Sequence, residues 1–194
     1  MTDNDLVELM ARTRTCRRFA EEEPVTTATL RELVALASLG GSARNLQPLK
    51  YVLVNDQELS AGIFPHLLWA GYLRDWPGPS PGERPPAYIV CLLDTRIAGE
   101  ADCDLGIATQ NILLGATASG LAGCRIGSVG PKVRRLLKLP DHLKILLIIA
   151  LGHPREEVVI EPVGPGGDIR YWRDEQQVHH VPKRSLDEII VKIG

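Results

Sequence analysis

Four arginines lie close together near the start of the chain, in the stretch RTRTCRRF at residues 12–19. The chain carries a formal net charge of -2, so this stretch concentrates positive charge in an acidic protein. A guanidinium presents a planar set of donors and a threonine hydroxyl adds a short directional one, a combination that suits phosphate. A basic run can equally be a solvated helix end. The stretch therefore predicts either an anion-binding segment or an exposed helix terminus.

Two further polar segments could bind a ligand, GGSARNLQP at residues 40–48 and GCRIGSVG at residues 123–130. In the first, Ser42, Asn45 and Gln47 offer the alternating donors and acceptors that can contact the edge of a heteroaromatic ring. An ordinary glycine-capped turn is the alternative. The second segment lacks the GxGxxG spacing of a dinucleotide-binding turn. We expect a polar loop at each segment.

The chain contains none of the common sequence signatures of a protein nucleophile or a catalytic metal. There is no GxSxG, no HExxH and no paired-carboxylate motif. His179 and His180 are adjacent, so on an extended segment they point to opposite sides and cannot easily share a metal. We therefore predict no metal site. If the protein is an enzyme, an organic cofactor is expected to carry the chemistry.

Length and composition indicate an ordinary globular protein. The 194 residues favour one domain covering 1–194. No basic stripe extends beyond the arginine cluster, which argues against a nucleic-acid partner, and no apolar run is long enough for a membrane span. Acidic residues stand at the start, where a signal peptide is basic, and the four cysteines form no CxxC pair. These features predict a cytoplasmic protein with reduced thiols.

Hydrophobic patterns predict three buried strands, at residues 51–54, 87–93 and 145–151. Helices are expected near residues 6–10, from a Thr26 or Thr29 cap to Gly40, and at 63–73, 102–121 and 133–137. The long 102–121 segment is rich in glycine and alanine, which indicates close approach by another element. The final SLDEIIVKI fits either a capped helix or a strand. Strands and helices without a regular alternation indicate an α+β fold.

Several of these segments, taken in order, resemble the FMN-dependent nitroreductase family. The resemblance rests on RTRTCRRF followed by PVT and a helix, on GGSARNLQPLKYVLV, on DLGIATQNILLGATASGLAGCRIGSV and on LKILLIIALGHP. Each motif alone is degenerate, but their common order and spacing are specific. The likeness extends over nearly the whole chain.

The resemblance implies a three-layer fold in which helices flank a central, mainly antiparallel sheet. It also implies a homodimer with a domain-exchanged C-terminal segment and with FMN bound at the subunit interface. The positions that match the family's phosphate and ribityl contacts are Arg14, Thr15 and Arg17, with Arg18 adjacent. The positions that match the segment approaching the flavin are Ser42, Ala43, Arg44, Asn45 and Gln47. Ile126 and Gly127 would lie against the isoalloxazine, and Lys183 and Arg184 would reach the phosphate.

The resemblance further implies that NADH or NADPH reduces the flavin at N5, and that an acceptor such as a nitroaromatic or a quinone then takes the electrons in a ping-pong cycle. No catalytic residue of the protein would be required. Two alternatives stay open. One is a non-catalytic flavin-binding or sensory protein, and the other is a specialised flavin-destroying or dehalogenating member of the family.

Two features depart from the family's pattern. Thr13-Arg14 stands where two consecutive basic residues are common, and the long segment DIRYWRDEQQVHHVPKR at 168–184 replaces a compact ending. This segment is expected to shape the substrate mouth or a dimer contact. Whether the aromatic residues line the pocket or pack in the core stays open for Trp69, Tyr72, Trp76, Tyr171 and Trp172.

Overall fold

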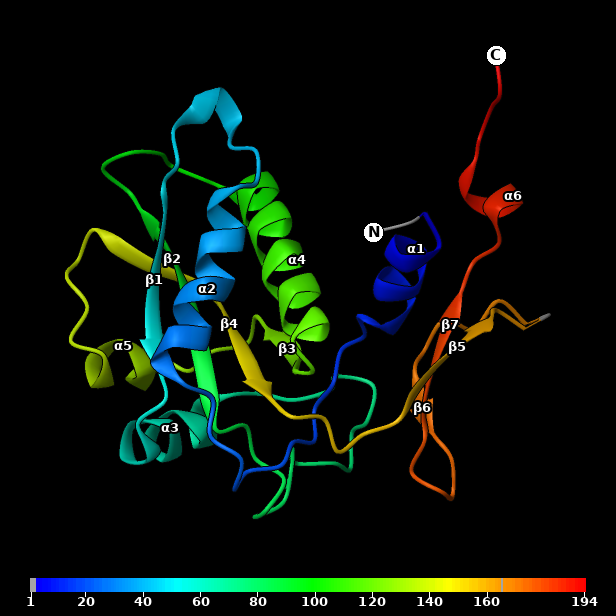
Figure 1. The fold of residues 1–194 in the computed structure, drawn as a ribbon, viewed down its shortest axis with the longest axis horizontal. Coiled ribbons are helices and arrows are strands. Elements are labelled where there is room, and N and C mark those ends of the chain that lie inside the picture. Colours follow the sequence, from blue (N-terminus) through cyan, green and yellow to red (C-terminus); the bar gives the residue numbers. More distant parts are fainter. Residues whose placement is uncertain (1–2, 165) are drawn as a thin grey trace.

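The computed structural model describes residues 3–164 and 166–194 and is built around a four-stranded antiparallel sheet (Figure 1). The strand order is β1-β2-β4-β3. The strands are β1 (Leu49–Val54), β2 (Ala87–Asp94), β3 (Ala122–Ile126) and β4 (Leu143–Gly152). Three of them coincide with the apolar runs that the sequence predicts. β2 and β4 occupy the centre, where both faces of a strand must be apolar.

Helices cover both faces of this sheet. On one face, α2 (Thr27–Ser38) and α4 (Asp102–Ala118) pack against the alternate strand residues that include Ile89 and Ile149. On the other face, α3 (Gln57–Ile63) and α5 (Lys132–Leu136) pack against a second core that includes Val90 and Ile148. Successive side chains of a strand point to opposite faces of the sheet, so each strand contributes alternate residues to the two cores. The predicted α+β fold with an antiparallel sheet between helices is confirmed.

The glycine-rich sequence of α4 reflects its close packing on α2. A Cβ atom added at Gly115 would lie 2.2 Å from Cδ1 of Leu36 and 3.2 Å from Cδ2 of Leu33. Only a residue without a side chain leaves room for these two leucines. The expectation that small residues mark a close approach is therefore confirmed for this helix.

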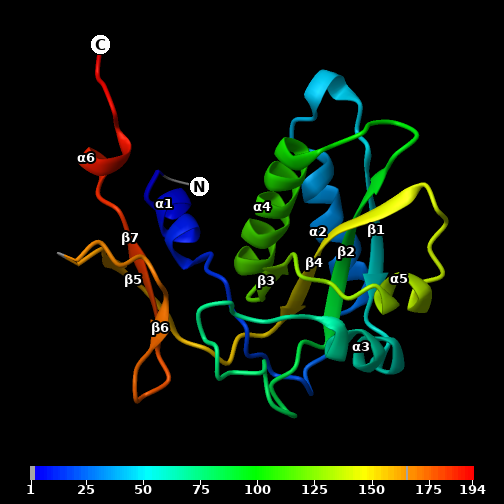
Figure 2. The same ribbon diagram turned by 180° about the vertical axis from the view of Figure 1, so that it is seen from behind.

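A smaller unit of structure lies beside the main sheet, beyond α4 (Figures 1 and 2). It contains the N-terminal α1 (Asp3–Arg12) and a three-stranded sheet of order β5-β7-β6. These strands are β5 (Val158–Pro162), β6 (Trp172–Arg173) and β7 (His179–Lys183). β7 runs parallel to β5 and antiparallel to β6. The segment at 168–184 thus forms most of a sheet.

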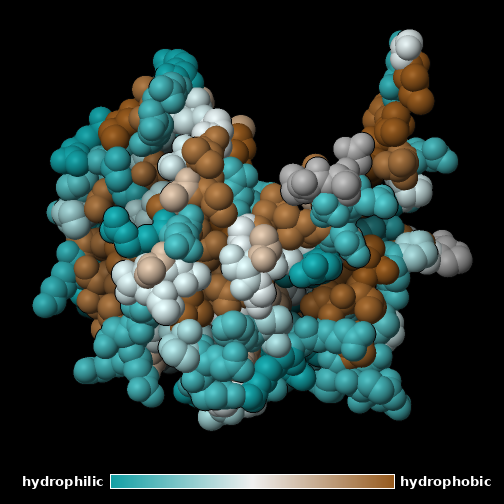
Figure 3. Space-filling view, viewed as in Figure 1, coloured by the Kyte–Doolittle hydropathy of each residue, from teal (hydrophilic) through white to brown (hydrophobic). Residues whose placement is uncertain are grey.

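The chain ends in a short helix and an extended tail. Ser185 caps α6 (Leu186–Ile189) through a capping box with Glu188, and the chain is extended from Ile190. Of the two alternatives for SLDEIIVKI, the capped helix is correct for its first part, and none of its described residues belongs to a strand. The tail leads away from the body of the protein and carries mostly apolar side chains (Figure 3).

Two sequence-based assignments are wrong. The helix expected at 63–73 is replaced by α3, which starts at Gln57 because Asp56 caps it by accepting a hydrogen bond from the backbone N–H of Leu59. It ends at Ile63, two residues before Pro65, which has no N–H to continue an α-helix. A short 3-10 turn, η2 (Phe64–His66), follows, and Leu67 is already extended. The polar loop expected at 123–130 contains β3, whose alternating buried residues include Cys124 and Ile126.

Within the described residues, no helix combines the length and the apolar character needed to cross a membrane. All four cysteines are free, and only Cys103 is exposed. Burial raises the pKa of the Cys16 thiol to about 12 and that of the Cys124 thiol to about 11. These two thiols are therefore unreactive core residues, in agreement with the expectation of reduced, structural cysteines.

Candidate functional site

A cavity of about 340 Å³ lies where α1, α4, β3 and the C-terminal sheet meet. It is lined by Thr13, Arg14, Thr15, Arg17, Gln110, Leu113, Arg125, Tyr171, His179, Val181 and Lys183. Four of the predicted site residues are among them: Arg14, Thr15, Arg17 and Lys183. Folding thus joins the N-terminal arginine cluster to a lysine near the other end of the chain.

The N-terminal segment is fixed in this position by β3. Thr15 forms an isolated parallel bridge with Gly123, and the backbone N–H of Cys16 donates to the carbonyl of Gly123 at 3.0 Å. A Cβ at Gly123 would lie 2.8 Å from the carbonyl oxygen of Ala150, so glycine is required there. This glycine was expected to belong to a ligand loop. In the structure, its missing side chain leaves room for the neighbouring strand β4 and for α4.

Arg125 adds a fourth cation to the cavity. Its Nε donates to Oγ1 of Thr109 at 2.8 Å and its Nη2 to Oε1 of Gln110 at 2.9 Å, both on α4. Burial lowers the pKa of this guanidinium, as it does for Arg14. Neutral partners hold the side chain in place and leave its charge uncancelled.

Arg17 is the most buried of the four cations, with 8% of its surface exposed. Its Nη1 donates to Nε2 of His179 at 3.1 Å, and its guanidinium lies 4.7 Å above the ring of Tyr171. Its backbone N–H donates to Oε2 of Glu156 at 2.7 Å. The side chain of Glu156 pairs with Arg173, and both of these side chains are buried. The guanidinium of Arg17 is therefore held by the ring nitrogen of His179 and the face of the Tyr171 ring.

The donor set of the cavity fits a phosphate ester. Across the part of the chain that the structure describes, Arg14, Arg17, Arg125 and Lys183 form no ion pair with a carboxylate, and no acidic residue lines the cavity. The Nε atoms of Arg14 and Arg17 are buried without a hydrogen-bond partner. Arg17 is buried and Arg14 half-buried, whereas Arg125 and Lys183 are exposed. A buried cation without a counter-ion is costly, and a bound dianion would offset that cost for the two inner arginines.

The predicted flavin-edge segment lies at a different place. Within it, η1 (Ala43–Asn45) is tied to the start of α4, because Oγ of Ser42 donates to Asp104 at 2.5 Å and the N–H of Ala43 donates to it at 3.0 Å. These bonds hold the pKa of the Asp104 carboxyl below its usual range. Ala43 and Arg44 line a second cavity, also of about 340 Å³, which shares no residue with the first.

Three residues of this segment have left-handed backbone conformations. The φ angles are 50° for Arg44, 55° for Asn45 and 51° for Gln47. Such values are uncommon outside glycine and cost free energy, so they persist only where the surroundings enforce them. Here the N–H of Gln47 donates to Oγ of Ser42 at 2.8 Å, which closes the turn. The segment is thus a rigid, exposed turn.

The remaining predicted residues lie outside the first cavity. Ile126 is 3% exposed and belongs to the core, and Gly127 lines a third cavity beside the first half of β4. Arg18 pairs with Glu83 at 3.4 Å, and Arg184 pairs with Glu188 at 3.2 Å. In a single chain, therefore, the predicted site residues divide into separate groups.

The aromatic residues also separate into three groups. Trp69 and Trp76 pack in the core, where their ring centroids are 6.5 Å apart. Tyr171 lines the first cavity and contacts Tyr72 with ring centroids 4.9 Å apart. Trp172 stacks on the ring of His180 at 4.0 Å. Tyr171, with Tyr72 behind it, is therefore the aromatic wall of the cavity.

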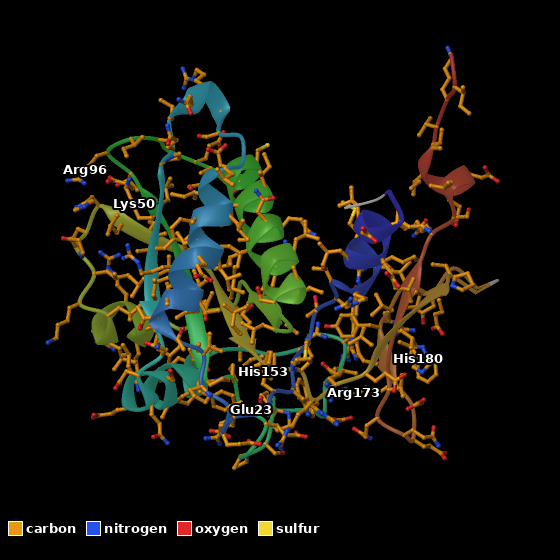
Figure 4. The ribbon with its side chains drawn as sticks, viewed as in Figure 1. Glu23, Lys50, Arg96, His153, Arg173 and His180 are labelled. Atoms are coloured by element: carbon orange, nitrogen blue, oxygen red, sulfur yellow. The ribbon has the colours of Figure 1, made fainter. Side chains whose placement is uncertain are left out.

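His180 forms a charged group with two carboxylates of the C-terminal sheet. Figure 4 shows that His180 and Arg173 both lie far from Lys50 and Arg96. Nδ1 of His180 lies 3.1 Å from Glu161 and Nε2 lies 3.3 Å from Asp174. In the described residues, no group of three or more histidine, cysteine or acidic side chains is placed to hold a metal ion.

Seven residues that line the cavity are not among the predicted site residues: Thr13, Gln110, Leu113, Arg125, Tyr171, His179 and Val181. Arg125 could have been found from the alternation of β3, in which Cys124 and Ile126 face the core and the residue between them must face the other side. No local signal places His179 beside Arg17, because the two are separated by 162 residues in sequence.

Comparison with known proteins places the chain among its relatives. Residues 10–75 and 83–153 match the model of the nitroreductase family. The chain belongs to the nitroreductase family. The match covers well over half of the chain and includes the arginine cluster, the η1 turn, α4 and the main sheet, but it ends before the C-terminal sheet.

Individual relatives agree with this assignment. The chain is 28% identical over 199 residues to the oxygen-insensitive NADPH nitroreductase of Salmonella typhimurium, covering 94% of this chain and 76% of that protein. A Parabacteroides distasonis structure, named provisionally as an NADH dehydrogenase or NAD(P)H nitroreductase, superposes with a TM-score of 0.65 at 25% identity, over 80% of this chain and 90% of that one. An FMN-dependent nitroreductase from Clostridium difficile superposes with a TM-score of 0.63 at 22% identity, over 78% and 88%.

Membership confirms the resemblance that the motifs indicated. This nitroreductase-family chain is an enzyme of the NAD(P)H-dependent nitroreductase and flavin oxidoreductase class. Its fold agrees with that of the solved nitroreductases. The family match does not extend to Tyr171, His179 or Lys183, so it assigns no role to the C-terminal wall of the cavity.

Proposed function

We propose that this nitroreductase-family enzyme binds FMN and uses NADH or NADPH to reduce a nitroaromatic, a quinone or a related acceptor. The observation that carries the proposal is the cavity with four cations and no acidic lining residue. A phosphate monoester near neutral pH carries a charge close to -2, which four cations without counter-ions match well.

In this proposal Arg14, Arg17 and Lys183 bind the phosphate, and the hydroxyl of Thr15 donates to it or to the ribityl chain. Arg125 supplies the further cation from β3. Residues 1–194 would act as one functional unit, because β7 brings Lys183 to the cavity that Arg14 also lines. Arg18 and Arg184, which pair with acidic neighbours, have a smaller role than the sequence suggested.

We further propose that the active form is a homodimer. The residues expected to contact the flavin edge, Ser42 to Gln47, line or border a cavity separate from that of the phosphate-binding cations. A second copy could bring the η1 turn of one protomer to the cavity of the other. The apolar tail after Ser185 is the segment that would be exchanged.

FMN, when bound, supplies the two-electron chemistry between the nicotinamide and the acceptor. The residues of the chain bind and orient it. The cations would hold the phosphate, and the ring of Tyr171 would close one side of the cavity. The turn at residues 42–47 of the second copy would present the side-chain amides of Asn45 and Gln47. The Salmonella relative is named an NADPH nitroreductase, which supports this class of reaction.

Titration of the apoprotein with FMN tests the proposal. We expect wild-type protein to become yellow and to oxidise NADH or NADPH with menadione or a nitrofuran faster than free FMN does. The double variant Arg14→Ala, Arg17→Ala should bind FMN at least about 100-fold more weakly, since each charge-assisted contact contributes about 1.5–3 kcal/mol.

Arg12→Ala is the matched control, because Arg12 is exposed and does not line the cavity. It should bind FMN as wild-type does. Wild-type protein that gains no flavin absorbance, or a double variant that retains FMN fully, would contradict the proposal. Bound FMN with no turnover above that of free FMN would support the alternative of a non-catalytic flavin-binding protein.

A further inference from the structure

His179, which the sequence left without a function, forms part of the wall of the phosphate-binding cavity. Its side chain is 1% exposed, and its Nε2 lies 3.1 Å from Nη1 of Arg17. The residue lies in β7, outside the residues that match the family model. This contact joins the C-terminal sheet directly to the arginine cluster.

The direction of the hydrogen bond determines which nitrogen of His179 carries the proton. A guanidinium can only donate, so Nε2 of His179 must accept with its lone pair. The imidazole is therefore neutral, and its single proton lies on Nδ1. Burial, aided by the nearby charges of Arg17 and Arg173 and opposed by that of Glu156, lowers the pKa of His179 to about 4. The neutral form thus persists at physiological pH.

A neutral partner matters because it holds Arg17 without cancelling its charge. A carboxylate at this position would form an ion pair and reduce the attraction of the guanidinium for an anion. The carboxylate closest to the backbone of Arg17 belongs to Glu156, and its side chain is already paired with Arg173. Arg17 also contacts the face of the Tyr171 ring.

We propose that His179 is the positioning residue for Arg17, and that it holds the guanidinium toward the cavity as a neutral acceptor so that the full charge binds a phosphate monoester. This role rests on the proposed FMN site, which uses the same cavity. Nδ1 of His179 is buried and has no hydrogen-bond partner. The acceptor nitrogen, and not the donor, is therefore the functional atom.

Three substitutions separate this role from a purely structural one. His179→Gln keeps an acceptor, His179→Leu fills the space without one, and His179→Glu supplies an acceptor that is charged. Each apoprotein is titrated with FMN and, in parallel, with riboflavin, which lacks the phosphate. Comparing the two ligands isolates the contribution of the phosphate contact.

We expect His179→Leu to weaken FMN binding about tenfold, the equivalent of one hydrogen bond to a charged group, while riboflavin binding stays close to that of wild type. His179→Gln should restore FMN binding to within about threefold of wild type. His179→Glu should bind FMN most weakly, because its carboxylate pairs with Arg17. Equal losses for both ligands in His179→Leu, or normal FMN binding by His179→Glu, would overturn the role.

A second measurement uses the wild-type chain without flavin. Nitrogen-15 chemical shifts of the imidazole should show Nε2 unprotonated and Nδ1 protonated at neutral pH, and protonated Nε2 would overturn the inference even if a variant fails to fold. Failure of the wild-type chain to bind FMN would instead overturn the proposed function, so the two failures are distinguishable.

Discussion

Glu156 shows at the scale of one residue how the cavity can keep four uncancelled cations. Its side chain is fully buried, pairs with Arg173 and accepts a hydrogen bond from the backbone of Arg17. Arg173 in turn lies 4.2 Å from the centre of the Trp76 ring. This buried carboxylate beside the site thus fixes the C-terminal sheet to the N-terminal segment.

Glu156→Gln should destabilise the protein by about 3–5 kcal/mol, because it leaves Arg173 buried without a counter-ion. The measurement is the free energy of unfolding in denaturant. Arg170→Gln is the matched control, since it breaks an ion pair with Asp168 that is largely exposed. That change should cost less than about 1 kcal/mol. Similar effects of the two substitutions would contradict the structural role of Glu156.

His179 should also make stability depend on pH. Its pKa is about 4 in the folded protein and 6.5 in a model peptide, so the unfolded chain binds the proton more readily. Stability should therefore fall as pH decreases from 6.5 toward 4. The loss approaches about 3 kcal/mol, since one pKa unit corresponds to about 1.4 kcal/mol. Unfolding curves measured across this range test the expectation.

His179→Gln is the control for this pH dependence, because glutamine does not titrate. The difference in stability between wild type and this variant should shrink as pH falls from 6.5. The pKa of His180 is raised, because its hydrogen bonds with Asp174 and Glu161 outweigh its partial burial. Its effect on stability therefore has the opposite sign, but it is the same in both proteins and cancels in the difference. A difference that is constant with pH would show that His179 is not the titrating group.

At the scale of elements, the packing of α4 on α2 decides which glycines can be replaced. Gly115 has Leu36 and Leu33 directly against it, whereas nothing lies within 4 Å of a Cβ added at Gly106 on the same helix. Gly115→Ala should destabilise the protein by about 1–3 kcal/mol through overpacking. Gly106→Ala should stabilise it by up to about 1 kcal/mol through helix propensity. Thermal unfolding of both variants tests this contrast, and equal shifts would contradict it.

Sequence patterns predict some of the helices and strands and miss others. The three apolar strands and α4 are predictable because burial on both sides demands continuous apolar runs and close packing demands small residues. β3 is missed because it is short and contains glycine, so its alternation is weak. α3 is misplaced because its start depends on the Asp56 cap, which outweighs the apolar pattern further along the chain.

At the scale of the whole molecule, the C-terminal tail exposes a series of large apolar side chains. The exposed fraction is 68% for Leu186, 58% for Ile189, 98% for Val191 and 85% for Ile193. Isolated exposed apolar residues are ordinary, but a contiguous row of them marks an interaction surface. This row supports the proposal that the tail packs on a second copy of the chain.

Replacing Ile189, Val191 and Ile193 by aspartate should therefore weaken dimerisation by at least about tenfold, because each charge would have to be buried at the interface. Sedimentation equilibrium measures the effect. The control variant Asp187→Asn, Lys192→Gln changes exposed polar residues of the same segment and should leave the dimer intact. A monomeric wild-type protein, or a triple variant that dimerises normally, would contradict the proposed exchange.

Local sequence was sufficient for the central strands, the basic segment around Arg14 and Arg17, and the recognition of the family, because these depend on residues close together in the chain. It could not place Arg125 and His179 beside these arginines, or separate the Ser42 turn from their cavity, and it placed Lys183 there only through the family resemblance. Those positions follow from contacts between distant segments, such as the 162-residue separation of Arg17 and His179. Such contacts form when the C-terminal sheet packs beside the N-terminal segment, and no local pattern of residues encodes that packing.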